Sequence, residues 1–348
     1  MHRALHIALV LAITGFPISS GATDAASGEI VVYNARPSTA LYDAFTKATG
    51  ISVVSVDGRP NELIEKHEDG SGPALDVIMG GNVDALTLFE QKGLFQPLSS
   101  DLVVKRIPEH LRAPTGAWFS TFLRGRAIFY NPDLVPDAPP ARYADLADPR
   151  FKGKICLGNG ATPYTTNFLS QMILDAGLPA TEQWVQDYVA NGADAPAGHD
   201  PVQILNVGHG RCAVTIANHY YFINLKAADT PEEREPLAKV KLVWPDQDGT
   251  GTIVHPGGAG LAKSAKNPDA AVKFLEFLVS DEGQRISAGR AFFPAASDVA
   301  LPDELAALGA PVKLNTSGVA KTADKREESR ALVERFNWPS SSPAARRP

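Results

Sequence analysis

Cysteine is scarce in this chain, and its scarcity excludes several kinds of site. Only two cysteines occur among 348 residues, Cys156 and Cys212. They lack the close CxxC spacing of zinc sites and redox motifs, so they make a poor metal site. In an oxidising compartment an even count favours a disulfide between them. Two buried free thiols in neighbouring strands are the alternative.

Other familiar signals are missing as well. The sequence contains no GxSxG nucleophile elbow, no HExxH pair and no P-loop, which argues against an enzyme. The net charge is -6, and no cluster of Lys and Arg occurs before the last residues. Nucleic-acid binding requires a basic face, so a nucleic-acid partner is not expected. A cation fits this charge better as a ligand.

Long apolar runs are absent except at the N-terminus. Ala4 to Phe16 is nearly all apolar, follows Met-His-Arg and precedes small residues. That order is typical of a secretory signal peptide, and the run is too short to span a bilayer. We predict that residues 1–26 are a signal peptide, cleaved between Ala22 and Ala26. The protein should then be a soluble periplasmic protein.

The rest of the chain alternates strand-like and helix-like segments, which predicts an α/β fold. Strands are expected at 29–34, 51–56 and 75–79, with helices at 39–49 and 61–67 between them. Ser38 or Thr39 would cap the first helix and Gly50 would end it. A second α/β pattern follows, with strands at 154–157, 213–217 and 240–244 and helices at 168–176 and 182–190. A Gly-rich loop at 248–260, a helix from Pro268 and a last helix at 326–336 complete the prediction.

Tyrosines are the candidate ligands. Tyr220 and Tyr221 are adjacent, and Tyr164 lies upstream in a similar setting, eight residues after Cys156 as Tyr220 is after Cys212. Phenolate oxygens are hard anionic donors that suit Fe(III). Taken alone, however, a tyrosine pair on an extended segment is usually structural, since successive side chains point to opposite faces. The other five tyrosines are interpreted as packing residues.

Several segments carry a resemblance that covers most of residues 29–338. They include Val31-Val-Tyr-Asn-Ala-Arg, Arg124-Gly-Arg-Ala-Ile-Phe-Tyr-Asn-Pro, Ala217-Asn-His-Tyr-Tyr and Phe274-Leu-Glu-Phe-Leu-Val-Ser-Asp-Glu-Gly-Gln. With them the chain resembles the periplasmic ferric-iron-binding proteins of ABC importers. The resemblance implies two lobes hinged by crossover strands, each lobe a mixed, mostly parallel sheet flanked by helices.

We expect the first lobe to comprise residues 29–126 and 251–300, and the second residues 127–250 and 301–338. Residues 339–348 are expected to be a disordered tail. The family does no covalent chemistry, and its members deliver iron to an inner-membrane ABC permease. The resemblance therefore implies a monomeric carrier of ferric iron.

The resemblance also implies a ligand set. The family's paired tyrosines match Tyr220 and Tyr221, and a further tyrosine used by some members matches Tyr164. Its paired arginines match Arg124 and Arg126, which would neutralise tyrosinate charge or hold an anion. The first-lobe His or His-Tyr of many members is replaced here by Arg36-Pro37-Ser38. Carbonate, citrate or water is thus expected to complete the coordination of Fe(III).

Some residues keep two interpretations. Arg36 lies close to a strand end and could hold an anion across the cleft, or form a surface ion pair. His255, in the Gly-rich segment, could contact an anion or have no role. His219 is either a donor behind the ligands or, as expected, a solvated loop residue. A binding protein for thiamine, a polyamine or an aminophosphonate is the competing hypothesis, because aromatic pairs also stack on organic cations.

Overall fold

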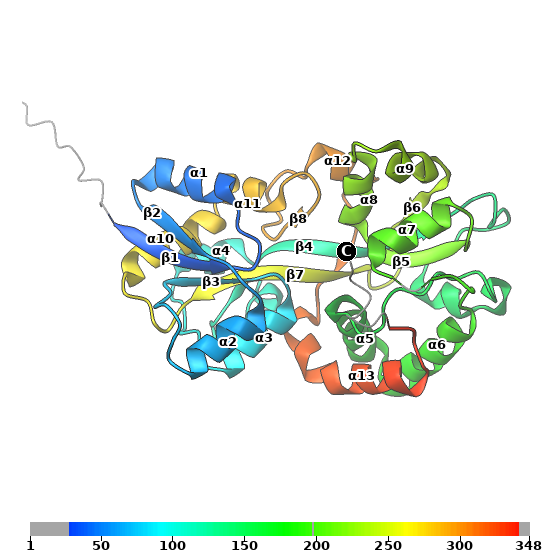
Figure 1. Ribbon diagram of the computed structural model, residues 1–348, viewed down its shortest axis with the longest axis horizontal. Helices are drawn as coiled ribbons and strands as arrows, with labels where there is room; N and C mark the ends of the chain where they lie inside the picture. Colours follow the sequence, from blue (N-terminus) through cyan, green and yellow to red (C-terminus); the bar gives the residue numbers. More distant parts are fainter. Residues whose placement is uncertain (1–27, 197, 341–348) are drawn as a thin grey trace, which may run out of the picture.

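The computed structural model describes residues 28–196 and 198–340, and it has two lobes joined by long strands. The predicted signal peptide and all but the first two residues of the predicted tail lie outside the described residues. Strands β4 (Phe119–Tyr130) and β7 (Thr252–Leu261) run horizontally between the lobes in Figure 1. They pair antiparallel with each other and belong to a nine-stranded sheet whose main path is β2-β1-β3-β7-β4-β5. The two-lobe, mixed α/β prediction is confirmed.

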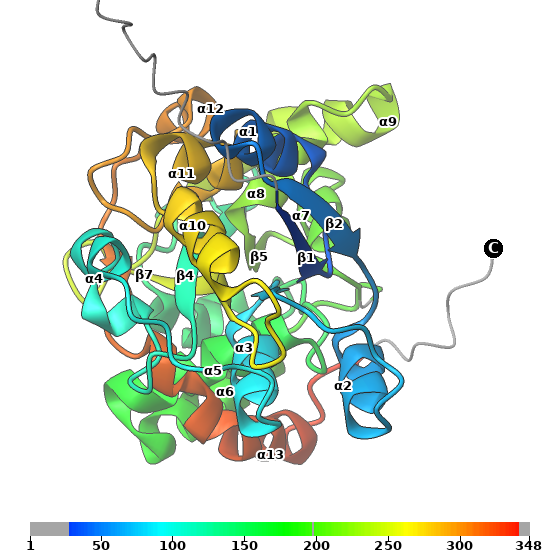
Figure 2. The ribbon, with the colours of Figure 1, turned by 90° about the vertical axis from the view of Figure 1, so that its left-hand side faces the viewer.

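The N-terminal lobe begins as the sequence pattern predicts. Strand β1 pairs in parallel with β2 and β3, and helices lie on both sides of these strands in Figure 2. Ser38 caps α1 by accepting from the Leu41 N–H, and Gly50 ends it in a left-handed conformation with φ 76°. The elements of this part are β1 (Glu29–Asn34), α1 (Thr39–Thr49), β2 (Ser52–Val56), α2 (Pro60–Glu68), β3 (Val77–Gly80), α3 (Val83–Gln91), α4 (Asp101–Arg106) and η1 (Glu109–Leu111).

Strand β7 corrects the prediction of a Gly-rich loop at 248–260. All ten of its residues are buried, and its glycines allow neighbouring strands to approach closely. A Cβ on Gly260 would lie 2.2 Å from the Ala117 carbonyl oxygen, and one on Gly258 would lie 2.3 Å from that of Phe119. Glycine usually signals a turn, but here it is required by the packing of a strand. After β7 come α10 (Pro268–Leu278), α11 (Asp281–Ala288) and β8 (Phe293–Pro294).

The C-terminal lobe is built on the far half of β4. Residues 126–130 of β4 pair antiparallel with β5, and residues 128–130 pair with β6. The strand predicted at 154–157 is reduced to a single bridging residue, Ile155. The elements of this part are η2 (Tyr143–Ala147), η3 (Pro149–Phe151), α5 (Pro163–Ala176), α6 (Leu178–Ala190), α7 (Asp200–Gly208), β5 (Val214–Asn218), α8 (His219–Lys226), α9 (Pro231–Arg234), η4 (Glu235–Lys239) and β6 (Lys241–Val243).

The predicted disulfide is present. Cys156 and Cys212 are bonded, with their Cα atoms 5.5 Å apart. Both residues are buried, and Val214, two residues after Cys212, pairs with Ile155 beside Cys156. The bond therefore joins the segments that lead to Tyr164 and to the Tyr220-Tyr221 pair.

The last segment returns between the lobes. Strand β9 pairs in parallel with the start of β7. Trp338, near the end of the described residues, is buried, and its indole N–H donates to the Gly158 carbonyl over 2.8 Å. The Pro339 carbonyl accepts from the Gly160 N–H, so the described residues of the predicted tail are anchored. The elements are α12 (Asp303–Ala306), β9 (Leu314–Asn315), η5 (Val319–Lys325) and α13 (Arg326–Arg335).

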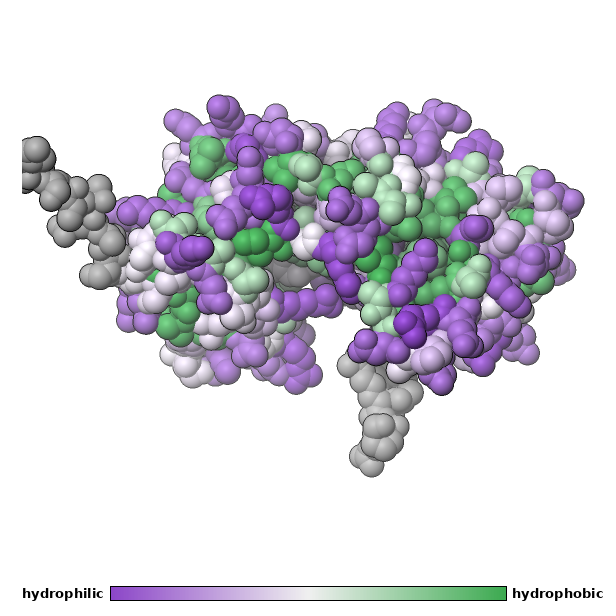
Figure 3. Space-filling view, turned by 90° about the horizontal axis from the view of Figure 1, so that it is seen from above, coloured by the Kyte–Doolittle hydropathy of each residue, from purple (hydrophilic) through white to green (hydrophobic). Residues whose placement is uncertain are grey.

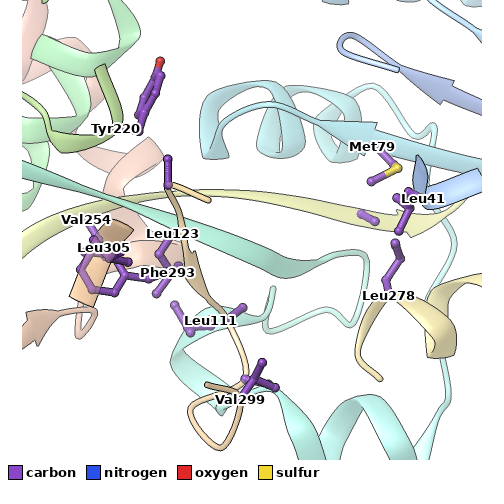
Figure 4. Close-up of a cluster of buried hydrophobic side chains, with 14 of the residues drawn as sticks. Leu41, Met79, Leu111, Leu123, Tyr220, Val254, Leu278, Phe293, Val299 and Leu305 are labelled. Atoms are coloured by element: carbon purple, nitrogen blue, oxygen red, sulfur yellow. The ribbon is translucent and has the colours of Figure 1, made fainter. Parts of the chain in front are cut away.

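One apolar core extends through both lobes along the crossover strands. It includes Leu41 and Met79 at one end and Tyr220 at the other, and Figure 4 shows the Tyr220 hydroxyl pointing away from the labelled apolar side chains. Figure 3 shows the surface hollowed between the lobes. Within the described ranges, none of the helices has the length and apolar character needed to cross a membrane.

Candidate metal-binding site

Tyr220 and Tyr221 lie in the first turn of α8, immediately after β5 ends at Asn218. The assumption of an extended segment is therefore wrong, and the two rings do not point to opposite faces. Their centroids are 4.1 Å apart. Tyr220 is buried and Tyr221 half-buried. Both side chains thus leave the start of one helix together, which an extended pair could not do.

Tyr164 lies in the first turn of α5, whereas the sequence predicted a loop there and a helix beginning only at 168. Pro163 occupies the first helical position and Thr162 caps the helix through the Thr165 N–H. Both features are ordinary helix-start signals that had been assigned to a loop. The three tyrosines therefore stand at the beginnings of two helices in the same lobe. Figure 1 shows α5 and α8 on opposite sides of the crossover strands.

The three phenols influence one another's ionisation. Burial and the neighbouring Tyr164 and Tyr221 raise the pKa of Tyr220, and Arg124 only partly offsets this. Burial and Tyr164 likewise raise the pKa of Tyr221. Burial also acts to raise the pKa of Tyr164, but Arg124, Tyr220 and Arg36 outweigh it and lower that pKa below its ordinary value. Tyr164 is accordingly the phenol that ionises first.

The Tyr220 hydroxyl has no hydrogen-bond partner among the residues that the structure describes, although it is buried. The phenols of Tyr164 and Tyr221 lie close enough to shift its pKa, and Tyr220 in turn shifts the pKa of Arg36. An unpaired buried hydroxyl is costly unless a ligand satisfies it. The hydroxyl is therefore available to a ligand that enters between the three tyrosines.

Arg124 faces this site from β4. Its Nη1 donates to the Tyr164 hydroxyl over 3.2 Å, and its other nitrogens donate to the carbonyls of Gly81, His255 and Pro256. The side chain is only 2 % exposed. Buried and charged, it stabilises the ionised form of Tyr164.

Arg126 has a different partner. Its Nη1 lies 2.5 Å from Asp200 Oδ2, and both side chains are buried. The same carboxylate oxygen accepts the Asn218 N–H over 2.8 Å, just before the tyrosine pair. Asp200, at the start of α7, was not singled out from the sequence, because no local signal separates it from an ordinary helix-start acid. The two predicted arginines therefore have different roles. Arg124 donates a hydrogen bond to Tyr164, whereas Arg126 positions the segment that carries the Tyr220-Tyr221 pair.

Arg36 approaches the tyrosines from the N-terminal lobe. Burial acts to lower the pKa of Arg36, yet the phenols of Tyr164, Tyr220 and Tyr221 outweigh that and raise it. The side chain remains exposed. The sequence allowed either an anion contact or a surface ion pair for Arg36. Within the described ranges it forms no ion pair with an acidic residue. The structure thus brings a first-lobe cation to the three phenols.

His255 is fully buried in β7 beside Tyr164, with ring centroids 6.2 Å apart. Burial, with Arg126 and Arg124 adding to it, lowers its pKa well below the ordinary value, so the ring is neutral. Its Nε2 has no partner among the described residues. The residue lies at the edge of the site, which agrees with the interpretation that it could contact a bound anion.

His219 corrects a prediction. It is not a solvated loop residue but the fully buried first residue of α8. Its Nδ1 lies 2.9 Å from the Gly125 nitrogen and its Nε2 lies 2.6 Å from the Ala291 carbonyl oxygen, so the neutral ring with a proton on Nε2 satisfies both. His219 thereby holds the start of α8 against strand β4 and the segment before β8.

Conventional metal ligands do not gather elsewhere in the described part of the chain. Across residues 28–196 and 198–340, no three His, Cys, Asp or Glu side chains come together in a way that could hold a metal ion. The oxygens that converge are phenolic. Such donors favour a small, highly charged cation over zinc or calcium.

Comparison with known proteins defines the class. Residues 72–315 match the family model described as bacterial extracellular solute-binding protein, and the chain belongs to this family. The family consists of solute-binding proteins of transport systems rather than enzymes.

Individual relatives narrow the likeness to the ferric-iron branch. The chain is 35% identical over 321 residues to iron uptake protein A2 of Synechocystis, covering 90% of this chain and 91% of the relative. Iron uptake protein A1 of the same organism is 33% identical over 316 residues, covering 89% and 87%. The solved Trichodesmium protein IdiA (FutA), in complex with iron and citrate ligands, superposes with a TM-score of 0.85 at 33% identity, covering 90% of this chain and 100% of that one.

Proposed function

We propose that this solute-binding protein captures Fe(III) in the periplasm and delivers it, as a monomer, to an inner-membrane ABC permease. Tyr164, Tyr220 and Tyr221 would bind the ion as tyrosinates. The observation that carries the proposal is the buried Tyr220 hydroxyl, which has no hydrogen-bond partner among the described residues and lies close to the phenols of Tyr164 and Tyr221 that raise its pKa. A ferric ion would satisfy it, and its charge would overcome the raised pKa values of Tyr220 and Tyr221.

Three tyrosinates would balance the charge of Fe(III) and leave coordination positions open. Carbonate, citrate or water would fill them, and Arg36 and Arg124 are placed to stabilise an anion by charge-assisted hydrogen bonds. His255 and Arg126 would act behind these residues. Because protons compete for phenolates, iron binding should weaken in acid.

The arginines also bear on the competing hypothesis, a binding protein for thiamine, a polyamine or an aminophosphonate. Arg36 and Arg124 would repel thiamine or a polyamine, and such cations, unlike Fe(III), would form no direct bonds to tyrosinate oxygens that offset this repulsion. An aminophosphonate carries an anionic group that these arginines could bind, so it remains the alternative worth measuring.

Ferric titration with visible spectroscopy tests the proposal. Wild-type protein should develop a coloured tyrosinate-to-iron charge-transfer band, and a Tyr220→Phe, Tyr221→Phe double variant should lose it. Tyr130→Phe, on β4 outside the site, is the matched control and should keep the band. Saturable binding of an aminophosphonate in calorimetry, with an unchanged spectrum on adding iron, would refute the proposal.

A further inference from the structure

The last described residues lie beside the loop that leads to Tyr164. The Trp338 indole N–H donates to the Gly158 carbonyl over 2.8 Å, and the Pro339 carbonyl accepts from the Gly160 N–H over 2.8 Å. A Cβ on Gly160 would lie 2.8 Å from Trp338 Cδ1, so the tryptophan packs directly against the loop backbone. Two hydrogen bonds and this close contact therefore attach the loop just before the start of α5.

The turn after α13, which lies beside α5 (Figure 1), directs Trp338 to this position. Asn337 has a left-handed conformation with φ 51°, and its N–H donates to the Glu334 carbonyl. The Trp338 N–H donates to the Val333 carbonyl over 3.0 Å. These bonds form the Schellman motif, whose left-handed position glycine usually occupies and asparagine tolerates. The chain thereby folds back on the helix, and Trp338 enters the core.

An aromatic cluster holds the Trp338 ring in place. The ring centroid lies 5.0 Å from that of Tyr188, which stacks on Trp184 at 4.5 Å with an angle of 15° between the planes. All three side chains are buried. Side chains packed in this way cannot shift without disturbing their neighbours. The loop at 158–160 is therefore attached to a fixed part of the C-terminal lobe.

Helix α5 connects this attachment to the phenol. Thr162 caps the helix by accepting from the Thr165 N–H, and the Thr165 hydroxyl donates to the Asn159 carbonyl over 2.9 Å. The loop and the first turn of α5 are thus bonded to each other, and Tyr164 lies in that turn. Its hydroxyl accepts from Arg124 Nη1 on strand β4 over 3.2 Å. A shift of the loop would move the phenol relative to Arg124.

We propose that Trp338 is a positioning residue for iron binding: it holds the loop before α5 so that the Tyr164 phenol reaches the metal. This inference rests on the proposed function, which it deepens. The turn at Asn337 belongs to the same device because it directs Trp338 inward. The adjacent tyrosine pair is held by other side chains, on α7 and α8, so Trp338 acts on iron binding through Tyr164.

Ferric titration of full-length variants with visible spectroscopy tests the inference. Asn337 is exposed, so replacing its side chain leaves the core intact. Asn337→Val should disfavour the left-handed turn, whereas Asn337→Gly, the matched control, should keep it and bind iron as the wild type does. Asn337→Val and Trp338→Ala should each lower the affinity for Fe(III) about tenfold, as loss of a support behind a metal ligand does. Their charge-transfer band should shrink by about one third, because one of three tyrosinate donors is displaced.

The same substitutions in a Tyr164→Phe background separate positioning from general stability. If Trp338 acts through Tyr164, Trp338→Ala should cause no further loss of affinity or of the band in that background. A loss that persists there would overturn the inference, and so would wild-type affinity in both Trp338→Ala and Asn337→Val. Should Trp338→Ala fail to fold, Asn337→Val supplies the same comparison.

A wild-type protein that binds no iron would refute the proposed function separately. Hydrogen exchange of the iron-free protein then decides on the attachment of the loop, because exchange reports local opening. Faster exchange of the amides at 160–166 in Asn337→Val than in Asn337→Gly supports the role of Trp338. Equal exchange in the two variants refutes it.

Discussion

At the scale of single residues, the site depends on which side chains lie behind the tyrosines. Arg124 and Arg126 are two residues apart on β4, so both leave the same face of the strand. Arg124 meets the Tyr164 hydroxyl, whereas Arg126 meets Asp200, whose carboxylate also holds the Asn218 N–H. A buried carboxylate without its guanidinium would be strongly destabilising, so Arg126 and Asp200 function as a unit. Their role is to fix the backbone from which Tyr220 and Tyr221 project.

His219 makes the folded protein sensitive to acid. Burial lowers the pKa of His219 to about 4, and Arg124 adds to the effect. In the unfolded chain the pKa is about 6.5. Between about pH 6.5 and about pH 4, His219 is therefore protonated in the unfolded state but neutral in the folded state. The free energy of unfolding consequently decreases as the pH falls through that range. Among the described residues, the aromatic side chains packed against this ring are Tyr220, Trp244 and Phe293, and none of them is a carboxylate that could pair with the charged ring.

We predict that His219→Gln removes this dependence. Between pH 7 and pH 4.5 the wild type should lose about 2–3 kcal/mol more free energy of unfolding than the variant, from about 1.4 kcal/mol per pKa unit. Urea unfolding at several pH values measures the difference. His67→Gln, on the exposed face of α2, should follow the wild type. Parallel curves for wild type and His219→Gln would contradict the prediction.

The sequence could identify the tyrosines but not their surroundings. Tyr220-Tyr221 and Tyr164 stand out as residue types with a chemistry. Asp200 and the buried state of His219 depend on contacts with residues 126 and 291, which are distant in the chain. Local patterns carry no information about such contacts. The role of Arg124 was inferred from a resemblance, and its bond to Tyr164 required the three-dimensional arrangement.

At the scale of elements, helices and strands were predicted correctly from the sequence where the capping residues and the apolar pattern indicated the same bounds. Helix α1 has the predicted bounds because Ser38 and Gly50 supply both of its caps. Strand β7 was missed because its glycines serve close packing instead of a turn. The predicted start of helix α5 was too late, at residue 168, because Thr162-Pro163 was assigned to a loop. For β7 a tertiary contact replaced the usual role of glycine, whereas for α5 an ordinary local helix-start signal was assigned to a loop.

The packing of β7 gives a prediction for Gly260. A Cβ at this position would overlap the Ala117 carbonyl oxygen and the Phe95 ring. Gly260→Ala should therefore lower the free energy of unfolding by about 2–4 kcal/mol, as overpacking against backbone does. Gly249→Ala is the control, because its Cβ would meet nothing closer than 3.6 Å and should change stability by less than about 0.5 kcal/mol. Equal thermal stability of the two variants would show that β7 can shift.

The disulfide gives a second prediction at this scale. It closes a loop of 56 residues that contains α5, α6 and α7. A Cys156→Ala, Cys212→Ala double variant should lose about 2–4 kcal/mol of stability, mainly because its unfolded chain is less constrained. Reductant should lower the melting temperature of the wild type towards that of the variant and leave the variant unchanged. Insensitivity of the wild type to reductant during unfolding would contradict this.

At the scale of the whole molecule, the two lobes are joined by more than the crossover strands. Residues of η5 reach the N-terminal lobe, where Ala320 packs against the core cluster that contains Leu86 and Phe89. Directly after η5, Arg326 begins α13. Its Nε and Nη2 both donate to Asp84 Oδ1 on α3, over 3.1 and 2.7 Å. Both side chains are only 17% exposed, so this pair is better shielded than an ordinary surface ion pair.

We predict that the Asp84–Arg326 pair restrains the relative position of the lobes. Asp84→Asn and Arg326→Gln should each lower the free energy of unfolding by about 1 kcal/mol, with a coupling of about 0.5–1 kcal/mol in the double-mutant cycle. Loss of the pair should also raise the radius of gyration of the iron-free protein in small-angle scattering, because hinge opening about β4 and β7 is then less opposed. Glu182 and Arg335 form the control pair, since both lie in the C-terminal lobe and their loss should leave the radius unchanged. If the Asp84 and Arg326 variants keep the wild-type radius while showing the coupling, the pair stabilises α13 locally and does not govern the lobes.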